Sequence, residues 1–361
     1  VLIQAGIHAG EIDGKDAGLM LLRDIAARGR GDLLDAVDVV FVPVLNVDAH
    51  ENSSEHGRPS QRGPARKGAR TSAQGLDLNR DYARLESPEV RAVVQLLRRL
   101  DPALYIDVHV SDGTDYQYDI TWAFAGWGTY ARSRETAGWL MGAYSSDLQQ
   151  ALKAAGHEPG VYPSWVDEDV PSQGLRISIE SPRYSTGYGD FIRVPTVLVE
   201  NHRFKPYRQR VLGTRVMLEQ SLRSVARDAD AIARAKHADR ATQADALAVR
   251  WERDPVPLEY RAFKGYRYDE QASPVSGARE LRWTGEAQLQ SLPVYGTRMV
   301  EAAPIPAAWW ILPGNPALLD LLQAHGIRTE PLATPRRMTL QRVQMANGLQ
   351  RDSFQRSEVG M

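Results

Sequence analysis

The sequence contains no cysteine among its 361 residues. Disulfide bonds and catalysis by a cysteine thiolate are therefore both excluded, and the sequence gives no redox indication of its compartment. A strong charge of one sign is also absent, since the formal net charge is −1. Nothing global therefore attracts nucleic acid or an anionic membrane surface. No apolar run approaches the roughly 18 to 20 residues of a membrane-spanning helix, so we expect no membrane span.

What the sequence does contain is typical of a soluble enzyme. Apolar residues make up 43% and charged residues 25% of a chain long enough for two domains, each with its own core. Strand-like and helix-like patterns alternate, which predicts an α/β fold with a mixed, mostly parallel sheet flanked by helices. We expect strands over 1–5, 37–44, 104–109, 175–181 and 196–200, and helices over 13–28, 88–100 and 131–155. The polar segment 46–75 is predicted to be an active-site loop.

The remainder of the chain differs in character. Residues 207–250 are rich in Ala and in the oppositely charged Arg and Asp. This composition predicts a solvated helix. We therefore divide the chain into a catalytic domain (1–215), a helical spacer (216–256) and a smaller β-rich domain of unknown role (257–361). Four aromatic residues of the last domain either pack in its core and between domains or line a ligand surface: Trp283, Tyr295, Trp309 and Trp310.

His8 and Glu11 are the most informative pair in the sequence. They lie three residues apart, directly after the apolar run 1–5 and before the predicted helix 13–28. The carboxyl ends of strands are where α/β sheets usually place active sites. Zinc in hydrolases is commonly held by two His and one Glu, with a fourth position open to water. A zinc site of this kind that contains His8 and Glu11 would therefore need one further histidine.

His109 is the best partner among the remaining histidines, because it ends the apolar run 103–108. His202 follows the buried-looking strand 196–200 and is the weaker competitor. The others lie in polar loops, in a charged helix or near a helix-ending glycine: His50, His56, His157, His237 and His325. A His and a Glu three residues apart often arise by chance on a solvated helix, so the metal site and an ordinary surface pair both stay open.

The stretch 77–80 places an Asp, an Asn and an Arg within one turn. Arg80 can grip a carboxylate with two hydrogen bonds and Asn79 adds directional donors, which suits the terminal carboxylate of a peptide. Asp77 is placed to accept a hydrogen bond from the outer ring N–H of a zinc-bound histidine. The alternative is an Asx-type turn with a surface arginine.

Together these motifs resemble those of the zinc carboxypeptidase family, the carboxypeptidase A-like metallopeptidases, in a bacterial-type branch. The resemblance extends over roughly residues 1 to 215, where the matching pieces occur in the family's order: 6–11, 46–48, 77–80, His109 and 195–200. It implies one Zn²⁺ per chain, held by His8, Glu11 and His109. It also implies that Asn79 and Arg80 hold the substrate carboxylate, with Asp77 supporting a ligand and Glu200 as general base.

The family's chemistry is hydrolysis of the C-terminal peptide bond, so the partner implied is a peptide or peptide-like substrate with a free carboxylate. Zinc would polarise the scissile carbonyl and lower the pKa of a bound water to about 7. Glu200 would take the proton of that water and pass it to the leaving amine. Two alternatives stay open, a zinc amidohydrolase or acylase of the same superfold, and an inactive peptide-binding homologue. A structural ion pair of Glu200 with Arg203 or Lys205 would favour the latter.

Several assignments depart from the family pattern or stay undecided. Arg70 is favoured over Arg62 and Arg66 for stabilising the oxyanion, because it lies nearest to the stretch 77–80, the predicted clamp for the substrate carboxylate. Tyr184 and Tyr188 are both candidates for the tyrosine that covers the substrate, and either one can equally be a structural aromatic. The preferred C-terminal residue and the choice among protein, peptidoglycan and small amide substrates stay open, as does the oligomeric state.

The N-terminus of the sequence also departs from the pattern. The family normally has a strand and a helix before the first motif, whereas residue 1 already lies within a predicted strand. We therefore expect that N-terminal elements are missing and that any signal peptide lies outside the sequence. A periplasmic or secreted location is slightly favoured.

Overall fold

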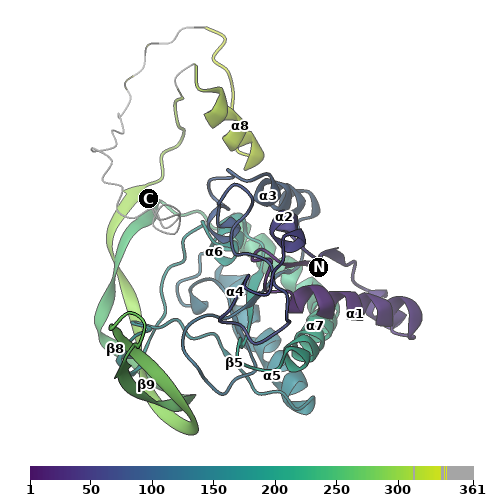
Figure 1. Ribbon diagram of the computed structural model, residues 1–361. Coiled ribbons are helices and arrows are strands. Elements are labelled where there is room, and N and C mark those ends of the chain that lie inside the picture. The colour runs from purple at the N-terminus through teal and green to yellow at the C-terminus, as the bar shows by residue number, and fades with distance from the viewer. Residues whose placement is uncertain (312–313, 335–336, 338, 340–361) are drawn as a thin grey trace.

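A six-stranded sheet forms the centre of the computed structural model, which describes residues 1–311, 314–334, 337 and 339 (Figure 1). Strands β4 and β7 pair antiparallel, whereas the other neighbours pair in parallel. The expected mixed, mostly parallel sheet is therefore confirmed. Its strands, in spatial order, are β2 (Val40–Val42), β1 (Leu2–Ala5), β3 (Tyr105–Val110), β7 (Thr196–Asn201), β4 (Ile120–Ala123) and β5 (Pro159–Val161).

Helices bury both faces of this sheet, which explains why its inner strands read as nearly continuous apolar runs. One core cluster joins Ile3, Ile106 and Val199 to three helical segments: α1 (Asp13–Ala27), α5 (Ser145–Ala154) and α7 (Tyr207–Ala241). A second cluster joins Leu2 and Tyr105 to α3 (Pro88–Leu100), α6 (Ser185–Ile192) and α8 (Pro316–Ala324). The sheet therefore lies between two helical layers, and its strand ends are held rigidly.

The predicted start of one helix agrees with the structure, whereas other predicted elements differ from it. Helix α3 begins after Ser87, whose side chain accepts a hydrogen bond from the Val90 amide, with Pro88 in the first turn. The helix predicted over 131–155 is instead divided into α4 (Arg134–Trp139), a π-helical turn (Leu140–Tyr144) and α5. The strand predicted over 175–181 is reduced to β6 (Leu175–Arg176), which pairs outside the central sheet. A short helix, α2 (Val47–Glu51), opens the loop predicted over 46–75.

Helix α7 corrects the prediction of a solvated spacer over 216–256. It ends at Ala241, and its buried side chains, including Met217, Leu218 and Leu222, belong to the main core. The mixed charges occupy the outer face and conceal this apolar stripe in the sequence. Among the described helices, α7 included, none is long and apolar enough to cross a membrane.

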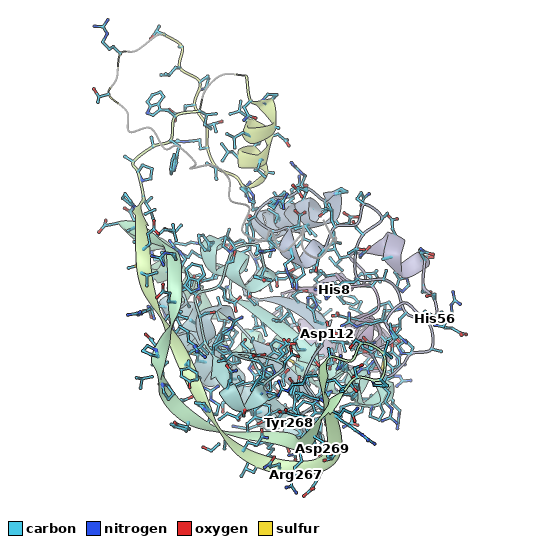
Figure 2. The ribbon with its side chains drawn as sticks, turned by 60° about the vertical axis from the view of Figure 1, so that its left-hand side comes forward. His8, His56, Asp112, Arg267, Tyr268 and Asp269 are labelled. Atoms are coloured by element: carbon cyan, nitrogen blue, oxygen red, sulfur yellow. The ribbon has the colours of Figure 1, made fainter. Side chains whose placement is uncertain are left out.

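The C-terminal part contains a separate β-rich sheet, as predicted. Strands β8 (Ala246–Ala272) and β9 (Arg279–Pro304) form a long antiparallel ribbon that pairs with β6 (Figure 1). Figure 2 shows Arg267, Tyr268 and Asp269 on this ribbon and His8 within the central body. Strand β8 begins well before the predicted boundary at residue 257.

Packing of the ribbon shows how it is attached. Phe263, Leu292 and Val294 share an apolar cluster with residues of the central body, including Tyr116 and Trp165. Of the four aromatic residues noted in the sequence, Trp309 and Trp310 are exposed, whereas Trp283 and Tyr295 are partly buried. Residues 340–361 of the predicted β-rich domain (257–361) lie outside the described residues, and the division into three domains stays a prediction.

Gly14 provides a test of how closely α1 approaches the sheet. A Cβ atom at Gly14 would lie 2.7 Å from the Val108 Cβ and 2.8 Å from the Ala5 Cβ, both on rigid strands. We expect Gly14→Ala to lower the free energy of unfolding by about 1–3 kcal/mol, as overpacked cores do. The matched control is Gly138→Ala in α4, where the added Cβ meets open space. It should be neutral or stabilising by up to about 1 kcal/mol. Urea unfolding of both variants makes the measurement, and equal stabilities would refute the close approach.

Candidate metal centre and active site

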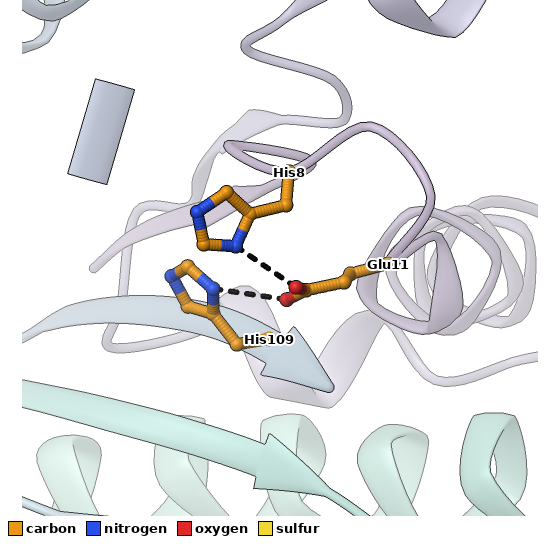
Figure 3. Close-up of side chains that lie close together, drawn as sticks. All are labelled: His8, Glu11 and His109. Atoms are coloured by element: carbon orange, nitrogen blue, oxygen red, sulfur yellow. Dashed lines mark hydrogen bonds and ion pairs between the residues drawn. The ribbon is translucent and has the colours of Figure 1, made fainter. Parts of the chain in front are cut away.

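Three predicted metal ligands converge at the carboxyl ends of two adjacent strands. His8 and Glu11 lie on the turn that leaves β1, and His109 lies near the end of β3. Their ligand atoms are all within 4.8 Å of one another, and all three residues are buried (Figure 3). The structure therefore forms the His-Glu-His group that the sequence predicted. His202, the competitor, lies elsewhere, with its Nε2 2.9 Å from the Asp115 Oδ1.

Both imidazole rings present the same nitrogen to the centre of this group. The Nδ1 of His8 lies 2.8 Å from the Glu11 Oε1, and the Nδ1 of His109 lies 3.0 Å from the Glu11 Oε2. The outer nitrogens face carboxylates, since the Nε2 of His8 lies 3.2 Å from Asp77 and that of His109 lies 3.1 Å from Asp107. Carboxylates in this position are how proteins orient metal-binding histidines.

Of the two carboxylates that face the outer histidine nitrogens, the sequence analysis predicted one. Asp77 takes the position predicted for it. Asp107 was missed, although its place two residues before His109 puts both side chains on one face of β3. Two nitrogens and one carboxylate, with the outer nitrogens supported, are a donor set that fits zinc.

Arg58 is a residue of this centre that the sequence analysis also missed. Its Nη1 lies 2.7 Å from the Glu11 Oε1, and its Nη2 donates to the Asp112 Oδ1 at 2.7 Å and to the Val110 carbonyl. Burial alone would raise the pKa of Glu11, but Arg58 and His8 hold it well below its usual value. Glu11 is therefore ionised, as a metal ligand must be.

Glu200 lies beside His109, because β3 and β7 are neighbours with these two residues in register. Its carboxylate is buried, and its Oε2 has no hydrogen-bond partner among the described residues. Burial raises the pKa of Glu200 to about 8, against the opposing effect of His109. Arg203 instead donates to the Gly113 carbonyl, and the Lys205 Nζ lies 3.7 Å from Asp119. A buried carboxylate with a perturbed pKa beside a ligand group is typical of functional sites.

The predicted carboxylate clamp forms a short 3₁₀ turn (Leu78–Arg80) next to the ligand group. Asp77 begins this turn, and its Oδ1 accepts a hydrogen bond from the Asn79 amide at 2.9 Å. The same oxygen faces His8, so the clamp and the metal centre share one carboxylate. The Arg80 guanidinium lies 4.7 Å from the centre of the Tyr184 ring, which holds it by a cation–π contact.

The geometry separates the arginine and tyrosine candidates that the sequence left open. Arg70 contacts Asp77 through Nε (3.0 Å) and Nη2 (2.8 Å), whereas the exposed Arg62 and Arg66 contact main-chain carbonyls. Tyr188 is buried, and its hydroxyl lies 3.0 Å from the His325 Nδ1, which attaches the end of α8. The structure therefore brings Arg70 to Asp77, and it places Tyr184 against Arg80 and Tyr188 against His325.

Comparison with known families agrees with the motifs. The family described as zinc carboxypeptidase matches residues 1–162. The match includes the His-Glu-His group and the clamp turn, and it ends before Glu200 and β7. The predicted resemblance to this family of metallopeptidases is therefore confirmed over residues 1–162.

Solved structures with a similar fold include bacterial metallo-carboxypeptidases and a bovine fibrinolysis inhibitor. A metallo-carboxypeptidase from Pseudomonas aeruginosa, bound to (2-guanidinoethylmercapto)succinic acid, is 17% identical with a TM-score of 0.45, covering 64% of this chain and 57% of its own. One from Burkholderia cenocepacia is 19% identical with a TM-score of 0.44, covering 62% and 56%. Bovine thrombin-activatable fibrinolysis inhibitor, bound to a tick carboxypeptidase inhibitor, is 19% identical with a TM-score of 0.44, covering 63% and 82%.

The chain thus spans less than two thirds of the length of the first two of these neighbours. No curated protein matches it.

Proposed function

We propose that this protein is a zinc-dependent metallocarboxypeptidase that hydrolyses the C-terminal bond of a peptide or peptide-like substrate. One observation carries the proposal. The ligand atoms of His8, Glu11 and His109 converge within 4.8 Å, and the buried Glu200 lies beside His109 in the next strand. These three residues would hold one zinc ion per chain.

Bound zinc would supply a Lewis acid that polarises a carbonyl and acidifies water. Glu200 would take the proton from the attacking water and deliver it to the leaving amine. Its burial excludes bulk solvent, so the proton passes between Glu200 and the reactants. Arg70, held by Asp77, would donate to the developing oxyanion, where one such donor is worth roughly 3–4 kcal/mol.

The turn that carries Asn79 and Arg80 would determine which bond of the substrate peptide is cut. Asn79 and Arg80 provide amide and guanidinium donors beside the metal centre, and these suit a terminal carboxylate. Tyr184 packs on Arg80 and limits its rotamers. A carboxylate held there would leave only the last peptide bond near the His-Glu-His group.

The test of this function compares free-acid peptides with C-terminally amidated ones. A hydrogen bond to a charged group contributes about 1.5–3 kcal/mol, so amidation should lower kcat/KM by roughly 10- to 150-fold. Arg80→Ala should narrow this difference by lowering the rate on the free acid alone. Arg84→Ala is the matched control, because Arg84 pairs with Glu86 at the surface a few residues further on. Equal cleavage of both forms by the unmutated protein would refute the carboxypeptidase and favour an amidohydrolase.

A further inference from the structure

Arg210, in the first turn of α7, connects several parts of the active site although it touches none of the proposed reacting groups. Only 1% of its surface is exposed. Its guanidinium lies within hydrogen-bond distance of six acceptor atoms from three separate segments, three of them around the two hydrogens of Nη1. Nε and Nη2 donate to the carboxylate of Asp13 at 2.7 and 3.2 Å. The main-chain acceptors are the carbonyls of Arg62 (2.7 Å), Gly63 (2.9 Å), Arg203 (3.0 Å) and Lys205 (3.0 Å).

Each of these segments carries part of the proposed site. Asp13 begins α1 two residues after Glu11. Residues 62–63 belong to the loop that carries Arg58 and Arg70. Residues 203–205 directly follow β7 and therefore Glu200. The two loops are also joined by a hydrogen bond from the Arg62 amide to the Arg203 carbonyl at 2.9 Å. One buried guanidinium thus holds three segments together. They are the turn that carries Glu11, the loop that carries Arg58 and Arg70 (the arginine loop), and residues 203–205 after Glu200 (the Glu200 segment).

Guanidinium chemistry is essential to this arrangement. Arginine offers five N–H donors in a rigid planar fork, whereas lysine offers three on a flexible stem. A lysine can keep the charge pair with Asp13 but cannot reach four carbonyls in two loops. We propose that Arg210 is a positioning residue that fixes the arginine loop and the Glu200 segment relative to the metal centre. The proposal rests on the peptidase function proposed above and extends it to a residue remote from the substrate.

A purely structural role for Arg210, as one more link between α1 and α7, is the alternative. Arg215 provides the matched control for it. It lies on the same helix and donates from Nε to the Asp24 Oδ2 at 2.9 Å, so it also joins α7 to α1. Its partners among the described residues are the carboxylates of Asp24, toward the far end of α1, and Glu219, on α7 itself, and neither belongs to a site loop. Arg210, unlike Arg215, joins the helix pair to the two site loops.

The experiment compares Arg210→Lys with Arg215→Lys on a free-acid peptide. We expect kcat to fall at least about tenfold in Arg210→Lys, because displacements near 1 Å can cost up to about a hundredfold. KM should change little, since the hydrogen bonds of Arg210 go to Asp13 and to the two loops and not to the turn that carries Asn79 and Arg80. Amide hydrogen exchange over 61–64 and 203–206 should be faster in Arg210→Lys alone. Arg215→Lys should leave kcat, KM and this exchange unchanged.

Two results would overturn the proposal. One is unchanged exchange in both segments of Arg210→Lys. The other is an equal loss of kcat in the two variants, in proportion to their loss of stability. If Arg210→Lys does not fold, the double variant Asp13→Asn with Arg210→Met removes both buried charges and answers the same question. If the unmutated protein does not cleave peptides, the proposed function fails, but the exchange comparison still decides whether Arg210 fixes the two segments.

Discussion

Replacing Glu200 with glutamine is expected to lower kcat by at least about a hundredfold, the lower range for losing a general acid–base group. Glutamine keeps the size and the hydrogen-bonding capacity of the side chain but cannot accept and return a proton. Glu200 is not one of the three grouped ligands, so zinc content should stay at one ion per chain. The fold should also survive, because the substitution removes a buried carboxyl group whose Oε2 has no partner among the described residues.

The measurement pairs kcat with zinc analysis on the same preparations. Asp239→Asn is the matched control, because Asp239 is also a buried carboxylate but accepts hydrogen bonds from the amides of Glu135 and Thr136, at the start of α4. It should lower stability without changing kcat of the folded protein. Near-normal turnover of zinc-loaded Glu200→Gln would mean that another group carries the proton.

The metal-ligand group was predictable because the residues next to each histidine in the sequence indicate its position at a strand end. His8 and His109 each follow a short apolar run, and parallel strands place their carboxyl ends at the same edge of a sheet. The sequence did not say that β1 and β3 are immediate neighbours, or that β7 places Glu200 in register with His109. The resemblance implied that the three ligands and Glu200 share one site, and the strand order and register come from the structure.

The missed residues depend on contacts between segments far apart in the chain. Arg58 resembles the other arginines of its loop, and only the folded loop brings it to Glu11. Arg210 looks like part of a charged, solvated helix, but its neighbours on α7 are buried. The ribbon β8–β9 was partly assigned to a helix because its strands are exposed over much of their length and show little apolar alternation.

Removing either histidine ligand is expected to abolish zinc binding and, with it, turnover. A zinc site with three protein ligands loses a third of its protein donors in His8→Ala or His109→Ala, and Glu11 is then left without one of its ring partners. The free energy of zinc binding is distributed over few bonds, so the loss of one ligand should lower affinity strongly. Removing a supporting carboxylate should cost less, about 10- to 100-fold in affinity, so Asp107→Asn is expected to be intermediate.

Zinc analysis of dialysed protein and competition with a coloured chelator would rank these variants. His237→Ala, on the exposed face of α7, is the matched control and should keep one zinc per chain. The expected order of affinity is the unmutated protein and His237→Ala first, Asp107→Asn next, and the two ligand variants last. This order follows from the geometry, because Nδ1 of each ring faces Glu11 while Nε2 faces a carboxylate. Full zinc occupancy in both His8→Ala and His109→Ala would refute the ligand assignment, and the function proposed from it would have no metal centre to support it.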